Sequence, residues 1–120
     1  KKNIKIVKKE IIKFVDKYKK KKIDIYGLGA ATKGNTLLNY CKLNYKNIES
    51  ILDKSDHKIS KFTPGSGIKI VNESNVKNIG AIIILPWNIT KHLKRNLMKN
   101  RRIPYISIQK AIKEINEKKN

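Results

Sequence analysis

Residues Ile25 to Cys41 read IYGLGAATKGNTLLNYC, and this stretch decides which fold the chain adopts. A short β-branched segment, Ile23–Tyr26, precedes a loop with three glycines, and a helical pattern follows over about Asn35–Leu43. A strand, a glycine loop and a helix in this order are typical of the phosphate-binding turn of nucleotide-binding βαβ units. The stretch therefore predicts an α/β fold with a candidate ligand loop at the end of its first strand.

The glycine spacing fits neither standard template for a phosphate loop. Gly27 and Gly29 match the first two glycines of the dinucleotide fingerprint G-x-G-x-x-G, but Thr32 occupies the position of the third glycine. Gly29, Gly34 and Thr36 match the glycines and the threonine of the G-x-x-x-x-G-K-[ST] template. Asn35 occupies the position of its lysine. A nucleoside triphosphatase is therefore not expected.

The loop nevertheless has the physical properties of an anion site. It opens a helix, whose first N–H groups have no helical partner and whose dipole is positive at that end. Gly27, Gly29 and Gly34 let the backbone approach a ligand, and Lys33 adds a positive charge. Asn35 and Thr36 can donate hydrogen bonds from the first turn. A tight turn without a ligand explains the glycines equally well, so spacing alone leaves both interpretations open.

The rest of the chain alternates helical and strand patterns. Apolar residues between Ile4 and Tyr18 recur at helical spacing and predict a leading amphipathic helix over residues 1–21. The further elements that we expect are strands over Ile48–Leu52, Ile68–Val71, Ala81–Leu85 and Ile103–Ile108 and helices over Asn88–Lys99 and Gln109–Glu117. This alternation predicts a single domain, residues 1–120, built on a three-layer Rossmann-like parallel sheet with helices on both faces.

The net charge of +20 raises the question of nucleic-acid binding. The positive residues are almost all lysines spread along the chain, whereas base readout favours arginine and single-strand binding favours exposed aromatic residues. Compositional drift and solvated helix faces explain the charge better, so nucleic acid is not the expected partner.

Cysteine, histidine and hydropathy patterns exclude further classes of protein. Cys41 is the single cysteine, which excludes an internal disulfide and a cysteine-based zinc cluster. His57 and His92 lie far apart and belong to no metal-ligand motif. No apolar run reaches the roughly 18 residues of a transmembrane helix, and the lack of cysteine pairs fits a cytoplasmic protein. Because the chain does not begin with Met, we expect a piece of a longer protein.

Asp53 follows the second expected strand of the βαβ unit. In nucleotide-binding folds an acidic residue at this place accepts hydrogen bonds from the ribose hydroxyls. An aspartate at a strand end is also a common cap for the next turn. Asp53 therefore supports a nucleotide site without establishing one.

Three blocks of the sequence together resemble one known family. They are GAATKGNTLLNYC (Gly29–Cys41), DKSDHKISKFTPGSGIKI (Asp53–Ile70) and ILPWN (Ile84–Asn88). The blocks resemble the C-terminal domain of S-adenosylmethionine-dependent sugar C-methyltransferases, which methylate a carbon of nucleotide-linked keto-deoxysugars such as dTDP-sugars. The resemblance covers about Ile23–Ile108 and implies a Rossmann-like domain that helps to bind the nucleotide-sugar. A preceding domain of such enzymes binds S-adenosylmethionine, and an N-terminal domain binds zinc.

The chain departs from the family pattern at a few positions. Thr32 stands where a small alanine is usual, and Lys42 follows the cysteine where glycine is common. The segment SDHKIS replaces the more usual pattern of Asn-Pro and Gly after Asp53. These departures concern the sugar and base preference more than the fold.

The resemblance also implies a set of ligand-binding residues. They are Gly29, Lys33, Gly34, Asn35, Thr36, Asn39, Tyr40, Asp53, Lys61, Phe62, Thr63, Gly65, Trp87 and Asn88. The helix start would hold the diphosphate, Asp53 the ribose, and the Lys61–Gly65 loop would lie beside the nucleotide. Phe62 would either stack on the base or anchor the loop in the core.

Two further positions in that set carry specific expectations. Tyr40 would be either polar lining of the site or core. Trp87 and Asn88 would form a pocket wall at the same carboxyl edge of the sheet as the glycine loop and the Thr-Pro-Gly loop.

In the family, a base removes a proton next to the sugar ketone, and the enolate attacks the sulfonium methyl group. The base and the cofactor-binding residues come from the preceding domains. We therefore expect this chain to bind a nucleotide-sugar weakly, to catalyse nothing alone and to hold no cofactor. Its expected partners are the nucleotide-sugar and the enzyme's own S-adenosylmethionine-binding domain, without a membrane. Two alternatives stay open: a basic module for nucleic-acid backbone or another nucleotide, and a degenerate domain kept for protein contacts.

Overall fold

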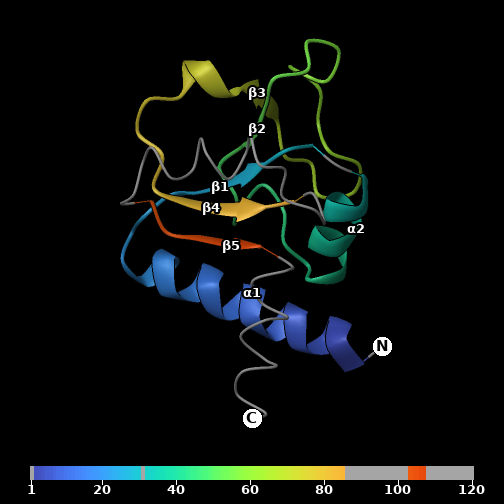
Figure 1. Cartoon of the computed structure of the whole chain (residues 1–120), viewed down its shortest axis with the longest axis vertical. Coiled ribbons are helices and arrows are strands. Elements are labelled where there is room, and N and C mark those ends of the chain that lie inside the picture. Colours follow the sequence, from blue (N-terminus) through green and yellow to red (C-terminus); the bar gives the residue numbers. More distant parts are fainter. Residues whose placement is uncertain (1, 31, 86–102, 108–120) are drawn as a thin grey trace.

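Five parallel strands form one sheet, which confirms the predicted α/β, Rossmann-like class. The computed structural model describes residues 2–30, 32–85 and 103–107. Within these residues the strand order is β3-β2-β1-β4-β5, with every pairing parallel (Figure 1). The strands are β1 (Ile25–Leu28), β2 (Ile51–Asp53), β3 (Ile70–Asn72), β4 (Ala81–Ile84) and β5 (Tyr105–Ser107).

The first strand begins and ends two residues later than the sequence pattern predicted. Gly27 lies inside β1, opposite Ile51 of β2 and Ile83 of β4, instead of starting the loop. A Cβ atom at this position would run into the Ile51 side chain, so the glycine serves close packing within the sheet. β4 and β5 lie within the expected segments, whereas β2 and β3 begin later than expected and extend one residue beyond them, to Asp53 and Asn72.

Helices α1 (Lys2–Lys20) and α2 (Thr32–Tyr40) cover the same face of the sheet (Figure 1). Val7, Ile11 and Val15, spaced one turn apart on α1, are buried in one cluster with side chains of α2 and all five strands. This spacing confirms the predicted amphipathic helix. Burial of each such side chain stabilises the fold by about 1.5–3 kcal/mol.

The second face of the sheet is apolar as well. The buried side chains on this face are those of Tyr26, Leu28, Leu52, Ile82 and Ile84. The helices expected over residues 88–99 and 109–117 lie outside the described residues. A short 3-10 helix, η1 (Glu73–Asn75), follows β3 on the way to β4.

Lysines occupy left-handed backbone positions at the ends of both α-helices. After α2, the Leu43 N–H donates to the Leu38 carbonyl and the Lys42 N–H to the Asn39 carbonyl. This pair of bonds is the Schellman motif, which places its penultimate residue in the left-handed region and favours glycine there. Lys42 has a φ of 59° and Lys22, at the end of α1, a φ of 58°. Lys42 therefore holds a strained conformation at a position that favours glycine.

We expect the substitution Lys42→Gly to stabilise the protein by roughly 0.5–1 kcal/mol. The left-handed region costs a residue with a Cβ atom about 1–2 kcal/mol, and the greater freedom of glycine in the unfolded chain offsets part of the gain. Urea denaturation followed by circular dichroism measures the change. Lys42→Ala is the matched control, because it removes the charge but keeps the Cβ atom, and it should bring no gain. Equal stabilisation by both variants would contradict the backbone explanation.

Candidate functional site

The carboxyl edge of β1 lies at the point where the strand order reverses direction. β2 and β3 lie on one side of β1, and β4 and β5 on the other. The loops after β1 and β4 therefore diverge from neighbouring strands, and a crevice at such a point is where ligands bind in open α/β sheets. Gly29 follows β1 with a φ of 87°, a conformation that glycine adopts without strain.

Asp53 fixes the loop that follows β1. Its two carboxylate oxygens accept hydrogen bonds from the Ala30 N–H at 2.7 Å and the Ser55 N–H at 2.8 Å. Partial burial opposes ionisation, but these backbone donors and the nearby Lys58 ammonium outweigh it and lower the pKa of Asp53. The carboxylate thus caps the turn that follows β2 and also links the loop after β1 to the loop after β2.

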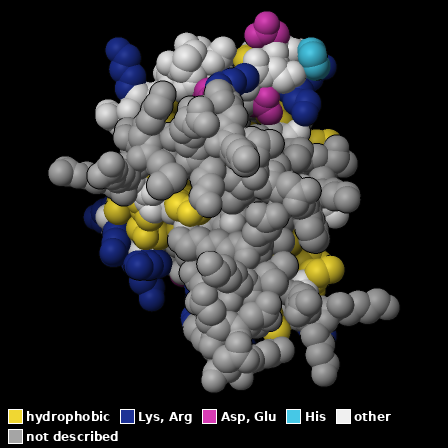
Figure 2. Space-filling model, in the orientation of Figure 1, with side chains coloured by type: hydrophobic (Ala, Val, Ile, Leu, Met, Phe, Trp, Pro, Cys, Tyr) yellow, Lys and Arg dark blue, Asp and Glu magenta, His cyan; other side chains and the backbone are white. Residues whose placement is uncertain are grey.

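Lys58, which was not among the predicted site residues, lies at the same loop. Its Nζ donates to the Ala30 carbonyl oxygen at 3.2 Å, so both backbone groups of Ala30 are held by the segment after β2. The Ser55 hydroxyl lies 3.0 Å from His57 Nε2 in the same segment. Charged and histidine side chains gather at the upper end of the face in Figure 2, where Figure 1 shows the loop after β2. The polar segment SDHKIS was the sequence signal for these side chains, because it follows the strand that ends at Asp53.

The first turn of α2 approaches the end of β4 very closely. A Cβ atom at Gly34 would lie 2.5 Å from the Leu85 Cβ and 2.6 Å from the Leu85 carbonyl oxygen. Gly34 therefore serves close contact between helix and strand. Lys33 belongs to this turn, but its side chain is not among those that the structure describes. Thr36, three residues after Lys33, is exposed.

The Thr-Pro-Gly loop is attached to the flank of α2. The Asn35 and Asn39 side-chain amides, one helical turn apart, each donate to the Pro64 carbonyl oxygen at 3.0 Å. Asn35 Oδ1 accepts a hydrogen bond from the Ser66 hydroxyl at 2.8 Å, and this hydroxyl also bonds that of the buried Thr63. The two asparagines thus hold the loop in place, a use that the sequence did not reveal.

The Thr-Pro-Gly loop lies lower along the sheet than the sequence analysis expected. The chain after Asp53 turns back along β3, where Phe62 bridges Lys69 in antiparallel fashion, just before the strand begins. Asp53, at the carboxyl edge, pairs with Asn72 of β3. Lys69, the partner of Phe62, precedes Asn72 by three residues, so the Phe62 backbone lies about 10 Å from the carboxyl edge. A Cβ atom at Gly65 would lie 2.8 Å from Asn39 Oδ1, so this glycine allows the loop to pack closely against α2.

The exposure of the two aromatic candidates bears on the alternatives that the sequence left open. Phe62 is 63% exposed, so it does not anchor the loop in the core, and Lys61 beside it is exposed as well. Tyr40 is 42% exposed at the far end of α2, where the Lys8 ammonium lies 4.9 Å from its ring centroid. Tyr40 is therefore not core. Trp87 and Asn88 lie outside the described residues.

Cys41 has the properties of a core residue. It is 4% exposed, and burial raises the pKa of its thiol to about 11, although the Lys8 charge acts in the opposite direction. Within the described ranges, no group of three His, Cys, Asp or Glu side chains is placed to hold a metal ion. In the same ranges, no helix has the length and apolar character needed to cross a membrane.

Comparison with known proteins adds one finding. The family model described as the C-methyltransferase C-terminal domain matches residues 1–104. No curated protein shows significant similarity to the chain.

Replacing Asp53 by asparagine should destabilise the protein by about 1–2 kcal/mol at pH 7. The amide keeps one acceptor oxygen for two backbone donors and loses the charge, and part of the effect is screened by solvent. The folded-state pKa of Asp53 lies below the unfolded value of about 3.9, so the carboxylate stabilises the fold above that pH. This contribution is lost as the pH falls through the folded pKa.

Urea titrations of both proteins between pH 3 and pH 8 measure the difference, which should shrink below about pH 4. Asp56→Asn is the control, because Asp56 is exposed in the same turn and should change stability by less than about 0.5 kcal/mol. A difference that stays constant down to pH 3 would contradict a role for the Asp53 charge.

Proposed function

We propose a ligand and a role for this chain from the premise that it belongs to the C-methyltransferase C-terminal domain family. In this proposal the chain is the substrate-holding domain of a longer S-adenosylmethionine-dependent enzyme. It binds the diphosphate of a nucleotide-linked keto-deoxysugar at the carboxyl edge of β1. The methyl donor and the catalytic base come from other parts of that enzyme.

The Lys58 ammonium and the start of α2 meet at the loop after β1, beside the Asp53 carboxylate, and this arrangement is the observation that carries the proposal. The Lys58 ammonium lies against Ala30, directly before α2, and the helix directs the positive end of its dipole to the same place. Both features favour an anion and disfavour a cation. The edge thus suits a diphosphate better than S-adenosylmethionine, whose sulfonium group is positively charged.

The neighbouring residues supply a plausible path for the rest of the ligand. Each carboxylate oxygen of Asp53 has a further lone pair, so the group can accept a ribose hydroxyl while it holds the loop. A nucleotide that extends from the edge along α2 would reach the exposed Phe62, whose ring could stack on the base. Asn35 and Asn39 would position that ring indirectly, by fixing the loop through Pro64.

Two titratable groups of the described residues, Cys41 and Asp53, are poorly suited to the methyl-transfer step itself. Removal of a proton next to a ketone needs a base with a suitable pKa and a donor for the developing enolate. Cys41 is a buried thiol whose pKa is raised to about 11, and Asp53 is a carboxylate whose pKa is lowered and whose oxygens are engaged. The role that fits the domain is therefore to bind and orient the substrate.

The charge of +20 favours a second candidate, a basic module that binds nucleic-acid backbone. Such a module would bind any polyanion, with an affinity that falls steeply with salt and depends on lysines over the whole surface. The nucleotide-sugar proposal requires instead that one lysine at the β1 loop matters more than others. Measurements on matched lysine variants separate the two.

The domain should bind dTDP or UDP, and the substitution Lys58→Met should weaken this binding about 5- to 20-fold. Loss of one phosphate-contacting ammonium removes roughly 1–2 kcal/mol. Phe62→Ala should weaken binding of dTDP but leave inorganic pyrophosphate unaffected, because pyrophosphate has no base to stack on the ring. Isothermal titration calorimetry at low salt measures all three ligands.

Lys46→Met is the matched control, because Lys46 is an exposed lysine in the turn before β2, at the opposite edge of the sheet. It should leave every affinity unchanged. Absence of binding to the folded wild-type protein at millimolar ligand would refute the proposed function. Equal losses in the Lys46 and Lys58 variants, together with tighter binding of DNA, would favour the basic module.

The 120-residue chain should transfer no methyl group by itself. Incubation with S-adenosylmethionine and a dTDP-linked keto-deoxysugar should leave both unchanged by mass spectrometry, because the base and the cofactor site lie elsewhere in the proposed enzyme. A sample that binds dTDP is the positive control for folding. Appearance of a methylated sugar above the rate without protein would show that this division of labour is wrong.

A further inference from the structure

A hollow lies between α1 and β5, apart from the carboxyl edge. It has a volume of about 280 Å³ and is open to solvent on one side. β5 is two strands away from β1, a lateral distance of about 10 Å, and no residue of the candidate site lines the hollow. This volume is near the lower end for ligand sites, so the hollow suits a molecule of one or two rings.

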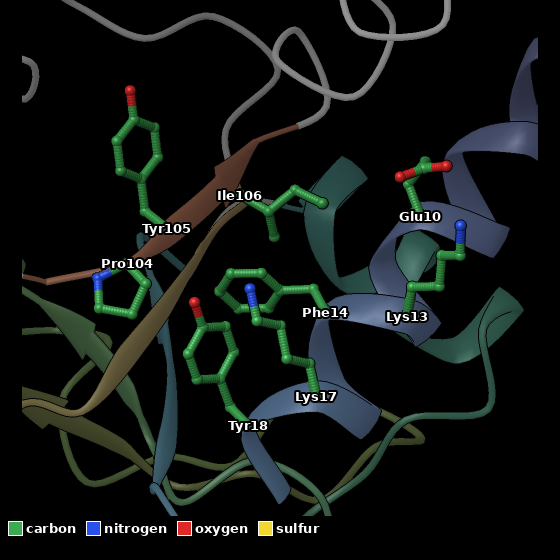
Figure 3. A pocket seen from close by; sticks show the side chains of 8 residues that line it. All are labelled: Glu10, Lys13, Phe14, Lys17, Tyr18, Pro104, Tyr105 and Ile106. Atoms are coloured by element: carbon green, nitrogen blue, oxygen red, sulfur yellow. The ribbon is translucent and has the colours of Figure 1, made fainter. Parts of the chain in front are cut away.

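The walls of the hollow are aromatic and aliphatic. Figure 3 shows the Phe14 and Tyr18 rings of α1 opposite Pro104 and the Ile106 side chain of β5, while the Tyr105 ring points away from the helix. The two α1 rings are 4.8 Å apart between centroids and tilted by 57°. Such an arrangement leaves ring faces and edges for contact with a further planar group.

The rim of the hollow carries an excess of positive charge. Lys13 and Lys17, which are exposed, line it together with Glu10. The Lys17 and Lys21 ammonium groups lie 5.4 Å and 5.5 Å from the Tyr18 ring centroid. Lys13 and Lys17 are one helical turn apart, a spacing at which like charges repel.

None of these ammonium groups has a carboxylate partner within the described residues. The one ion pair found there joins Lys54 to Glu73 on another part of the surface. Glu10 is not within ion-pair distance of the lysines beside it, and the three charges at the rim leave a net charge of +1. An anion bound in the hollow would reduce the repulsion between Lys13 and Lys17, because both ammonium groups would attract it.

We infer that the hollow between α1 and β5 binds a small planar organic anion, an aromatic ring that carries a carboxylate or a phosphate. The ring lies against Phe14 and Pro104, and the anionic group reaches Lys13 and Lys17 at the rim. The Tyr18 hydroxyl, which Figure 3 shows directed toward β5, is a donor for the same group. This site is independent of the nucleotide site at the carboxyl edge.

Titration of the ¹⁵N-labelled 120-residue chain with 4-hydroxybenzoate tests the inference. Saturable chemical-shift changes should centre on Phe14, Tyr18 and Ile106, with a dissociation constant of millimolar or tighter. The uncharged 4-hydroxybenzamide and the aliphatic anion acetate should each bind at least about five-fold more weakly, because each lacks one of the two required features.

Variants at the rim and the wall separate specific binding from bulk charge. The double variant Lys13→Gln with Lys17→Gln should weaken 4-hydroxybenzoate binding at least about five-fold. Phe14→Leu should also weaken it, because the variant keeps an apolar side chain but removes the aromatic ring. Lys9→Gln is the control, because Lys9 is exposed on the same helix and does not line the hollow.

Three results would overturn the inference: no saturable shift at ten-millimolar ligand, equal binding of acetate, or equal weakening by Lys9→Gln. The amide spectrum of each variant reports whether it is folded. Because the site is independent of the carboxyl edge, loss of dTDP binding would leave this inference intact.

Discussion

The hydrogen bond from the Ala30 N–H to the Asp53 carboxylate is the contact on which the candidate site depends. It joins the ends of β1 and β2 at the point where the strand order reverses. Lys58 completes the arrangement by bonding the Ala30 carbonyl, so one residue is fixed from both sides. α2 begins two residues later, and its direction therefore follows from an interaction between loops that are distant in sequence.

This contact explains why one aspartate can have a structural and a ligand-binding role together. A carboxylate that accepts two backbone N–H groups stays ionised under physiological conditions, because each donor stabilises the charged form. A charged group with unused lone pairs at a ligand edge still accepts hydroxyl donors. The cap and the ribose acceptor are therefore compatible interpretations of Asp53, and the loop geometry is set before any ligand arrives.

Local patterns predicted the elements, whereas long-range contacts decided what the site residues do. Ala81–Ile84 and the Val7–Val15 face of α1 were predictable because period and β-branching reflect burial directly. Gly34 was expected to let the backbone approach a ligand, and the structure adds a close approach to Leu85, a residue far away in sequence. The antiparallel return of the chain to Phe62 depends on hydrogen bonds with residues around Ile70, which spacing does not reveal. The two helices expected beyond β4 and β5 lie outside the described residues.

The excess of lysine also has a physical interpretation at the level of individual sites. One diphosphate carries about two negative charges, so it cannot account for a net charge of +20. Lysines that lie on open surface are solvated and cost little, which is consistent with drift in composition. Lys58 at Ala30 and the pair Lys13 and Lys17 beside an aromatic hollow differ from these, because the fold holds each near groups that could share a ligand. Position relative to neighbouring groups, not the total charge, therefore distinguishes a binding lysine from a solvated one.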